Sequence, residues 1–183
     1  DSTSKLAVSS FTIGTVTDNA GNAMTSTTVP TGSNMFTGKT IIIDTTAPTV
    51  SSFTTTTAAG SYKIGEVIEI TANTNETIQS GNNITVTLNN SNNTNVDLTA
   101  SGNGTTMVGT YIVESGDNTS KLAISSFSIG TVVDNAGNTM TSTTVPTGSN
   151  MFTGKTIIID TTAPTVSSFT TTKAAGSYKE GDR

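Results

Sequence analysis

Apolar and polar residues alternate with a period of two through the middle of the chain, which is the pattern of strands that bury one face. The pattern predicts strands over residues 49–57, 66–74, 84–88, 96–98, 107–113, 122–133 and 156–160, with a turn at 59–65. Turns rich in Asn and Gly separate them. About seven short strands in about 115 residues indicate an antiparallel β-sandwich of two sheets, for which we expect the immunoglobulin-type order.

The composition supports an all-β fold. Thr, Ser, Asn and Gly dominate, and charged residues make up only 11% of the chain. Thr, Val and Ile favour strands, whereas Asn, Gly and Ser favour turns. The few Lys, Glu, Leu and Ala residues leave no plausible amphipathic helix.

The chain repeats itself with a period of 116 residues. Residues 1–67 and 117–183 align without a gap and are identical at 58 of 67 positions. A period of this length is that of a whole domain. The sequence therefore predicts the C-terminal part of one repeat at 1–46, a complete repeat at 47–161 and the start of another at 162–183. Strands are also expected at 5–8 and 11–16, the copies of 121–124 and 127–132.

A short joint marks the boundary between repeats, and it occurs at 41–50 and again at 157–166. Three isoleucines end a strand, Asp44 and two threonines follow, and Pro48 then prevents continuation of the ladder.

Several functions are excluded or disfavoured by what the sequence contains. It has no Cys and no His, so Ser-His or Cys-His catalysis and the usual zinc sites are excluded. A net charge of −5 argues against binding to nucleic acid. No apolar run is long enough to span a membrane, so no membrane insertion is expected in this segment. The acidic residues lie at turns and joints, and we expect no enzyme.

The positions of the acidic residues give the main functional signal. Of 13 Asp and Glu residues, eight fall on four repeated positions, Asp1/Asp117, Asp18/Asp134, Asp44/Asp160 and Glu66/Asp182. In an immunoglobulin-type sandwich, Asp44, Glu76 and Asp134 would meet at one pole, and Glu66 and Asp160 at the other. Converging carboxylates suit calcium, which takes six to eight oxygen ligands. The simpler alternative is that these acids cap turns and solvate the linker; Asp1 and Asp117 are assigned to that alternative.

Three phrases carry a resemblance: Val-Val-Asp-Asn-Ala-Gly-Asn, Asp-Thr-Thr-Ala-Pro-Thr-Val and Ser-Tyr-Lys-Ile-Gly-Glu-Val-Ile. They resemble bacterial immunoglobulin-like, cadherin-like tandem repeats of giant surface adhesins, including extender regions of the repeats-in-toxin type. The resemblance implies calcium at the joints between repeats and an extracellular location. The metal ligands it implies are Asp18, Asp44, Glu66, Asp134, Asp160 and Asp182, with Glu76 retained as an acid. The stretch 24–39 and its copy are a longer insertion than such repeats lead us to expect.

The expected function is that of a structural extender that projects a distal binding domain, made rigid by calcium at its joints. Its expected partners are neighbouring repeats of the same chain and, through other domains, a host or bacterial cell surface. The alternative is an adhesive module that binds glycan or cells through loops 74–83 and 89–106. Two modifications also remain open, glycosylation at Asn-x-Ser/Thr sites and isopeptide bonds from Lys39 or Lys155.

Overall fold

The computed structural model describes residues 2–3, 5–31, 39–148 and 154–182. Asp1 and residues 32–38 of the insertion at 24–39 lie outside these residues. The described part holds eight strands and no helix, so the predicted all-β fold is confirmed. The strands are β1 (Val50–Thr54), β2 (Gly60–Tyr62), β3 (Val67–Ile78), β4 (Asn83–Leu88), β5 (Asn95–Thr99), β6 (Gly104–Ile112), β7 (Ile124–Thr131) and β8 (Ile157–Ile159).

Six antiparallel strands form one curled sheet in the order β1-β3-β6-β5-β4-β7. Strand β5 joins its two halves, because it pairs with β4 over five residue pairs and with β6 only through Thr99 and Val108. One layer is built on β1, β3 and β6 and the facing layer on β4 and β7, with β5 between them and hydrogen-bonded mainly to β4. The two sheets expected of an immunoglobulin-type sandwich are here one sheet that is continuous through β5, and β2 and β8 form a separate pair.

The core lies between the two layers and follows the alternation of the sequence. In β3, Ile68, Ile70 and Ala72 are fully buried. Phe53 of β1 meets Phe127 of β7 edge to face, with ring centroids 5.7 Å apart, and this contact holds the two layers together. Further buried side chains come from every long strand: Ile84, Val86, Leu88, Leu98, Met107, Tyr111, Leu122, Val132, Met140, Ile157 and Ile159.

The predicted turn at 59–65 contains a strand. Residues Gly60–Tyr62 pair in parallel with Ile157–Ile159 of β8. Lys155 reinforces this edge, since its Nζ donates hydrogen bonds to the carbonyl oxygens of Thr55 and Thr57, at 3.0 and 3.3 Å. Its ammonium group is thus bound to backbone carbonyls. Gly60, Ser61 and Tyr62 do not alternate between apolar and polar residues, which is why the sequence predicts only a turn there.

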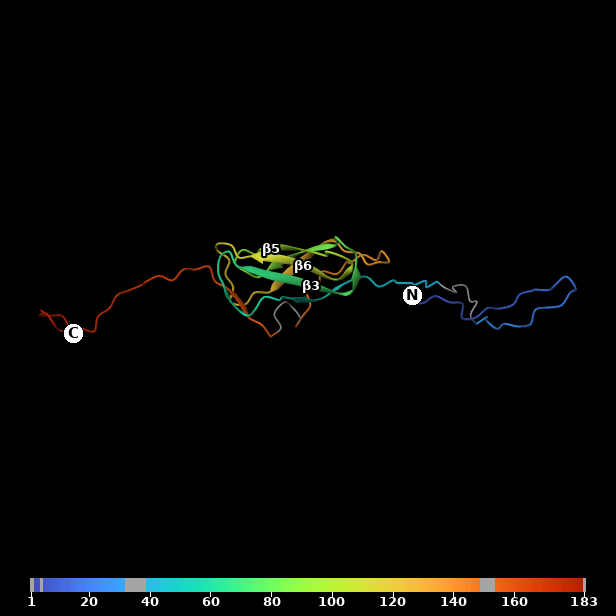
Figure 1. Cartoon of the computed structure of the whole chain (residues 1–183), viewed down its shortest axis with the longest axis horizontal. Coiled ribbons are helices and arrows are strands. Elements are labelled where there is room, and N and C mark those ends of the chain that lie inside the picture. The colour runs from blue at the N-terminus through green and yellow to red at the C-terminus, as the bar shows by residue number, and fades with distance from the viewer. Residues whose placement is uncertain (1, 4, 32–38, 149–153, 183) are drawn as a thin grey trace.

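The segments before and after the module are extended and lie at its opposite ends (Figure 1). In the described part of 1–46 and of 162–182 the only pairings are the isolated bridges Thr3↔Ile43 and Thr17↔Ala23. The strands expected at 5–8 and 11–16 are therefore absent. Their copies in the module pair with β4 and pack on β3 and β6, and residues 1–46 contain no copy of β3–β6.

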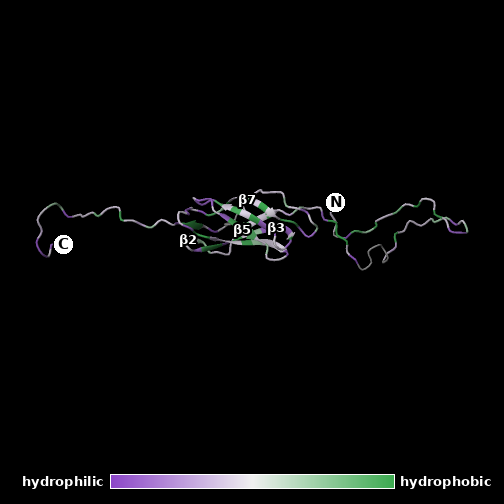
Figure 2. Cartoon of the chain, turned by 90° about the horizontal axis from the view of Figure 1, so that it is seen from above, coloured by the Kyte–Doolittle hydropathy of each residue, from purple (hydrophilic) through white to green (hydrophobic). Residues whose placement is uncertain are grey.

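Hydrophobic residues recur along these segments (Figure 2), and several of their side chains are exposed. Phe169 is 94% exposed, whereas its copy Phe53 is 1% exposed. Val16 is 50% exposed and its copy Val132 is fully buried. The same sequence is thus covered inside the module and uncovered outside it.

Candidate metal centre at the entry to the module

Three carboxylates meet where the chain enters the module. Asp44, Glu76 and Asp134 each place a carboxylate oxygen within 4.8 Å of the others. Asp44 and Glu76 are half-buried, and Asp134 is buried. Among the described residues, these three carboxylates form a group that could hold a metal ion. They are the same three residues that the sequence predicts for one joint.

Asp134 is held by the tight turn that follows β7. Its Oδ1 accepts hydrogen bonds from the backbone N–H groups of Ala136 and Asn138, both at 2.8 Å. Its Oδ2 accepts one from Asn138 Nδ2 at 2.7 Å. Gly137 takes a φ of 93°, which a residue with a side chain rarely adopts. The turn therefore fixes the carboxylate before any ligand binds.

Glu76 reaches the pole because β3 departs from regular pairing near its end. The register between β3 and β6 is interrupted between Asn73 and Ile78. Thr74 stabilises this irregular stretch by donating its Oγ1 hydrogen to the carbonyl oxygen of Glu76, at 2.7 Å. The interruption is what lets a strand residue lie at the end of the sandwich.

Asp44 comes from the linker, and the module holds its backbone. The carbonyl oxygen of Asp44 accepts a hydrogen bond from Asn138 Nδ2 at 3.1 Å, and its Oδ1 caps the N–H of Thr46 at 3.0 Å. Asn75 and Thr49 form two hydrogen bonds. Thr49 N–H donates to Asn75 Oδ1, and Asn75 N–H donates to the carbonyl oxygen of Thr49.

The electrostatics of the three acids differ. Burial, followed by the negative charges of Asp44 and Asp134, raises the pKa of Glu76. Burial also opposes ionisation of Asp134, but the hydrogen bonds from Asn138 and Ala136 outweigh it and lower the pKa of that carboxyl. Two unit charges 4.8 Å apart repel by roughly 3 kcal/mol at an effective dielectric constant of about 20. A bound cation would remove this repulsion.

The other predicted ligands lie outside this group. Asp18 is exposed in the first segment, where it caps its own turn through Ala20 and Asn22, and these bonds lower its pKa. Glu66 accepts a hydrogen bond from Lys63 N–H at 2.7 Å, and Asp182 accepts one from Lys179 N–H at 3.0 Å. Asp160 caps Thr162. The structure thus gives Glu66 and Asp160 separate capping roles at the opposite pole.

Sequence reasoning missed the part played by two asparagines. The amide nitrogen of Asn138 joins Asp134 to the linker. The side-chain oxygen of Asn75 accepts a hydrogen bond from Thr49 N–H. The recurrence of Asn at 22 and 138 was the available signal for the first; Asn75 lies outside the repeated part and carried none.

The sites of the sequence pattern Asn-x-Ser/Thr also have internal roles. Asn89 and Asn92 direct their amide nitrogens to Lys121 and Asp117, and Asn118 directs its own to Gly116. These side chains hold loops together, so a glycan on them would require the loops to open.

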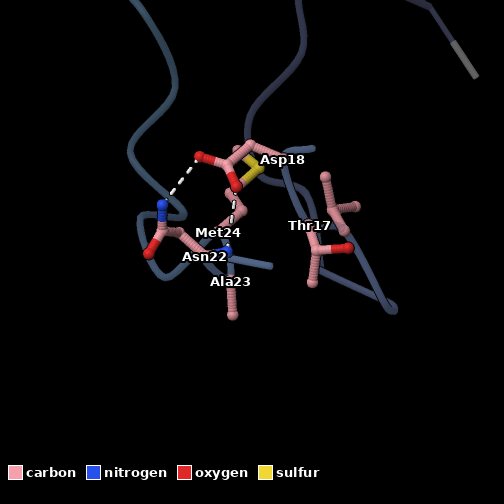
Figure 3. Close-up of a pocket in the computed structure, with 6 residues that line it drawn as sticks. Thr17, Asp18, Asn22, Ala23 and Met24 are labelled. Carbon is pink, nitrogen blue, oxygen red and sulfur yellow. Dashed lines mark hydrogen bonds between the residues drawn. The ribbon is translucent and has the colours of Figure 1, made fainter. Parts of the chain in front are cut away.

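A pocket in the first segment is lined by Val16, Thr17, Asp18, Asn22, Ala23 and Met24 (Figure 3). Two of its apolar members, Val16 and Met24, are copies of core residues: Val132 is fully buried and Met140 is 2% exposed, whereas Met24 is 43% exposed. The pocket is therefore the uncovered inner side of a hairpin that the complete module packs away.

Asp117, assigned to a polar loop from the sequence, is fully buried at the exit pole. Its Oδ2 accepts hydrogen bonds from Tyr111 Oη at 2.7 Å and from Glu114 N–H at 2.9 Å. Its Oδ1 accepts from Asn92 at 2.9 Å and from Thr94 at 3.3 Å. Burial and this carboxylate raise the pKa of Tyr111. With four donors, Asp117 is a structural anchor.

Comparison with known protein families gives a match over the first part of the chain. A family model described as "Invasion associated locus B (IalB) protein" matches residues 1–110. No curated protein and no solved structure matches the chain. The resemblance to immunoglobulin-like adhesin repeats is therefore wrong, because the match is to IalB and to no such repeat. It depended on turn and linker phrases, which different β-proteins share for the same steric reasons. Since the match covers more than half of the 183 residues, the chain belongs to the IalB family.

Proposed function

We propose that the chain is a structural spacer made of repeated β-sandwich modules, with calcium stiffening the joint at which each module begins. The observation that carries the proposal is the convergence of Asp44, from the linker, with Glu76 and Asp134, from the module. A cation there would tie the incoming chain to the module.

The chemistry of this group favours calcium. Three carboxylates offer hard oxygen ligands, and backbone carbonyls or water would complete the six to eight that calcium takes. Magnesium requires stricter octahedral geometry and keeps more of its water. We expect a weak site, with a dissociation constant of about 10⁻⁴ to 10⁻³ M.

The arrangement of the ends supports a spacer. The chain enters and leaves the module at opposite ends (Figure 1), so successive modules would extend in one direction. The repeated sequences on either side are copies of the end and of the beginning of the same module. Each module would add roughly 40 Å, given strands that rise about 3.3 Å per residue.

As part of the proposal, the spacer acts outside the cell, where calcium would fill a weak site, and holds other domains away from a surface. We assign it no catalytic role. The family description mentions invasion and names no ligand or reaction. Among the described residues, no helix is long and apolar enough to cross a membrane.

Calcium titration by calorimetry tests the proposal. We expect one site in the full chain that is lost in Asp134→Asn and in Glu76→Gln. Asp18→Asn is the matched control, because Asp18 is the repeat copy of Asp134 and lies in the same turn without the two partners. Absence of calcium binding, or equal binding by Asp134→Asn and Asp18→Asn, would overturn the proposal.

A further inference from the structure

The linker before the module is held by hydrogen bonds from both of its sides. On the preceding side, Thr3 and Ile43 exchange backbone hydrogen bonds at 2.7 and 3.1 Å. The side chain of Ser2 makes the next contact with the linker. Its Oγ accepts a hydrogen bond from Thr45 N–H at 3.3 Å and lies 3.2 Å from Thr45 Oγ1. The preceding segment therefore holds the linker as far as Thr45.

The module holds the same linker from the other side and begins one residue earlier. Asn138 Nδ2 donates to the carbonyl oxygen of Asp44 at 3.1 Å. Thr49 N–H then donates to Asn75 Oδ1 at 2.6 Å. The carbonyl oxygen of Asp44 and the N–H of Thr45 belong to one trans peptide group and point in opposite directions, so the first can bind the module while the second binds the preceding segment.

We propose that this overlap is the interface between successive modules, a two-sided clasp in which Ser2 and Asn138 hold adjacent linker residues. Because the two sets of contacts overlap at Asp44 and Thr45, the first segment cannot bend away from the module without breaking at least one of these hydrogen bonds. The clasp restricts the joint without a metal ion, and calcium adds to it. The inference rests on the proposed function, since it concerns how one module of the spacer meets the next.

The exit pole of the module carries the same half of the clasp. Asn118, the repeat copy of Ser2, accepts a hydrogen bond from Thr161 N–H at its Oδ1, at 3.0 Å. Gly116 N–H donates to Thr161 Oγ1 at 3.2 Å. This holds the outgoing chain up to Thr161, the copy of Thr45. The partner that fits here is a further module of the same sequence, whose copies of Asn138 and Asn75 would bind from the other side.

The difference between Ser2 and Asn118 predicts joints of unequal stiffness. Besides accepting from Thr161, Asn118 donates its Nδ2 hydrogen to the carbonyl oxygen of Gly116, at 3.2 Å. Its side chain is therefore fixed at both its oxygen and its nitrogen. A serine has one hydroxyl oxygen and no amide nitrogen, so the Ser2 joint lacks this second anchor and is expected to be the less stiff of the two.

The clasp can be tested in the full chain, which has no native Cys. Nitroxide labels at Lys5→Cys and Ser126→Cys, both exposed, report the distance between the first segment and the module by pulsed electron paramagnetic resonance. In chelator we expect a narrow distribution that at least doubles in width with Asn138→Ala or with Ser2→Ala. Asn22→Ala, the copy of Asn138 that contacts no linker, is the control.

The outcomes separate the clasp from the calcium site. If Asn138→Ala and Asn22→Ala give the same width, or if only one of the two clasp variants broadens the distribution, the two-sided clasp is wrong. If calcium fails to narrow the distance distributions of the variants, the proposal that calcium stiffens the joint is wrong, while the clasp stands. Ser2 lies outside the module, so Ser2→Ala tests the clasp even if Asn138→Ala disturbs folding.

Discussion

At the scale of single residues, Glu76 links the acid group to pH. Its pKa is raised above the ordinary value of 4.5, so between the two values the folded chain binds more protons than the unfolded chain. The free energy of unfolding of the calcium-free protein should therefore fall as pH rises through that window. Asp134, whose pKa is lowered, gives the opposite slope below its ordinary value of 3.8.

Glu76→Gln should remove this fall in the free energy of unfolding. Chemical unfolding at a series of pH values in the presence of chelator measures it for the wild-type protein and the variant. In calcium the wild-type protein should instead gain stability over the same window, because protons and the ion compete for the same oxygens. Identical pH profiles for the wild-type protein and for Glu76→Gln would contradict the repulsion described above.

Asp117 is a residue whose replacement should lower the free energy of unfolding by a definite amount. An amide at this position puts an NH₂ group against either Glu114 N–H or Asn92 Nδ2, whichever oxygen it replaces. We expect Asp117→Asn to lower the free energy of unfolding by about 2–3 kcal/mol. Asp97→Asn is the control, since Asp97 is exposed and accepts one hydrogen bond from Thr85. Its effect should stay within about 0.5 kcal/mol, and equal losses would show that burial of Asp117 does not matter.

The sequence predicted the acids of the site but little of what holds them. Repetition singled out Asp44 and Asp134, and the assumed sandwich brought Glu76 to them. The role of Asn138 was not predictable, because its hydrogen bond to Asp44 spans 94 residues. Asp117 was misjudged for the same reason, since nothing local shows that Tyr111 and Asn92 enclose it.

At the scale of elements, the crossing of β5 and β6 depends on a glycine. A Cβ at Gly109 would lie 2.2 Å from the carbonyl oxygen of Asp97 and 2.6 Å from Leu98. Gly109→Ala should therefore force the strands apart and cost about 1–3 kcal/mol, measured by thermal or chemical unfolding. Gly102→Ala, where a Cβ meets no atom within 4 Å, should change stability little. A tolerated Gly109→Ala would contradict the close approach of these strands.

Alternation predicted the long strands well and the short ones poorly. Strand β4 and the first eight residues of β3 bury every second side chain, and the sequence shows this directly, whereas β6 buries only Met107 and Tyr111. Strand β2 exists only because Ile157–Ile159 lies beside it, and Gly60–Tyr62 has no pattern of its own. The expected strands in 5–16 show the reverse case, in which a suitable sequence lacks the neighbours that would pair with it.

At the scale of the whole molecule, a repeated pair of phenylalanines tests the division into modules. Phe53→Ala should lower the free energy of unfolding by about 3–5 kcal/mol, because Phe53 is buried against Phe127. Phe169→Ala, the same change at an exposed copy, should have almost no effect in this chain. In a chain extended by a further 116-residue repeat, Phe169→Ala should become as costly as Phe53→Ala. Continued indifference there would mean that residues 162–183 do not begin a module.

The most direct test of a calcium-stiffened spacer is small-angle X-ray scattering of three tandem copies of residues 47–162, with calcium and with excess chelator. Calcium should give a long, fixed maximum dimension of about 120 Å, three modules of roughly 40 Å each. The chelated form should be shorter on average or more broadly distributed, though still restricted by the clasp. A profile unchanged by chelation would contradict calcium stiffening, and a compact profile in calcium would contradict the spacer itself.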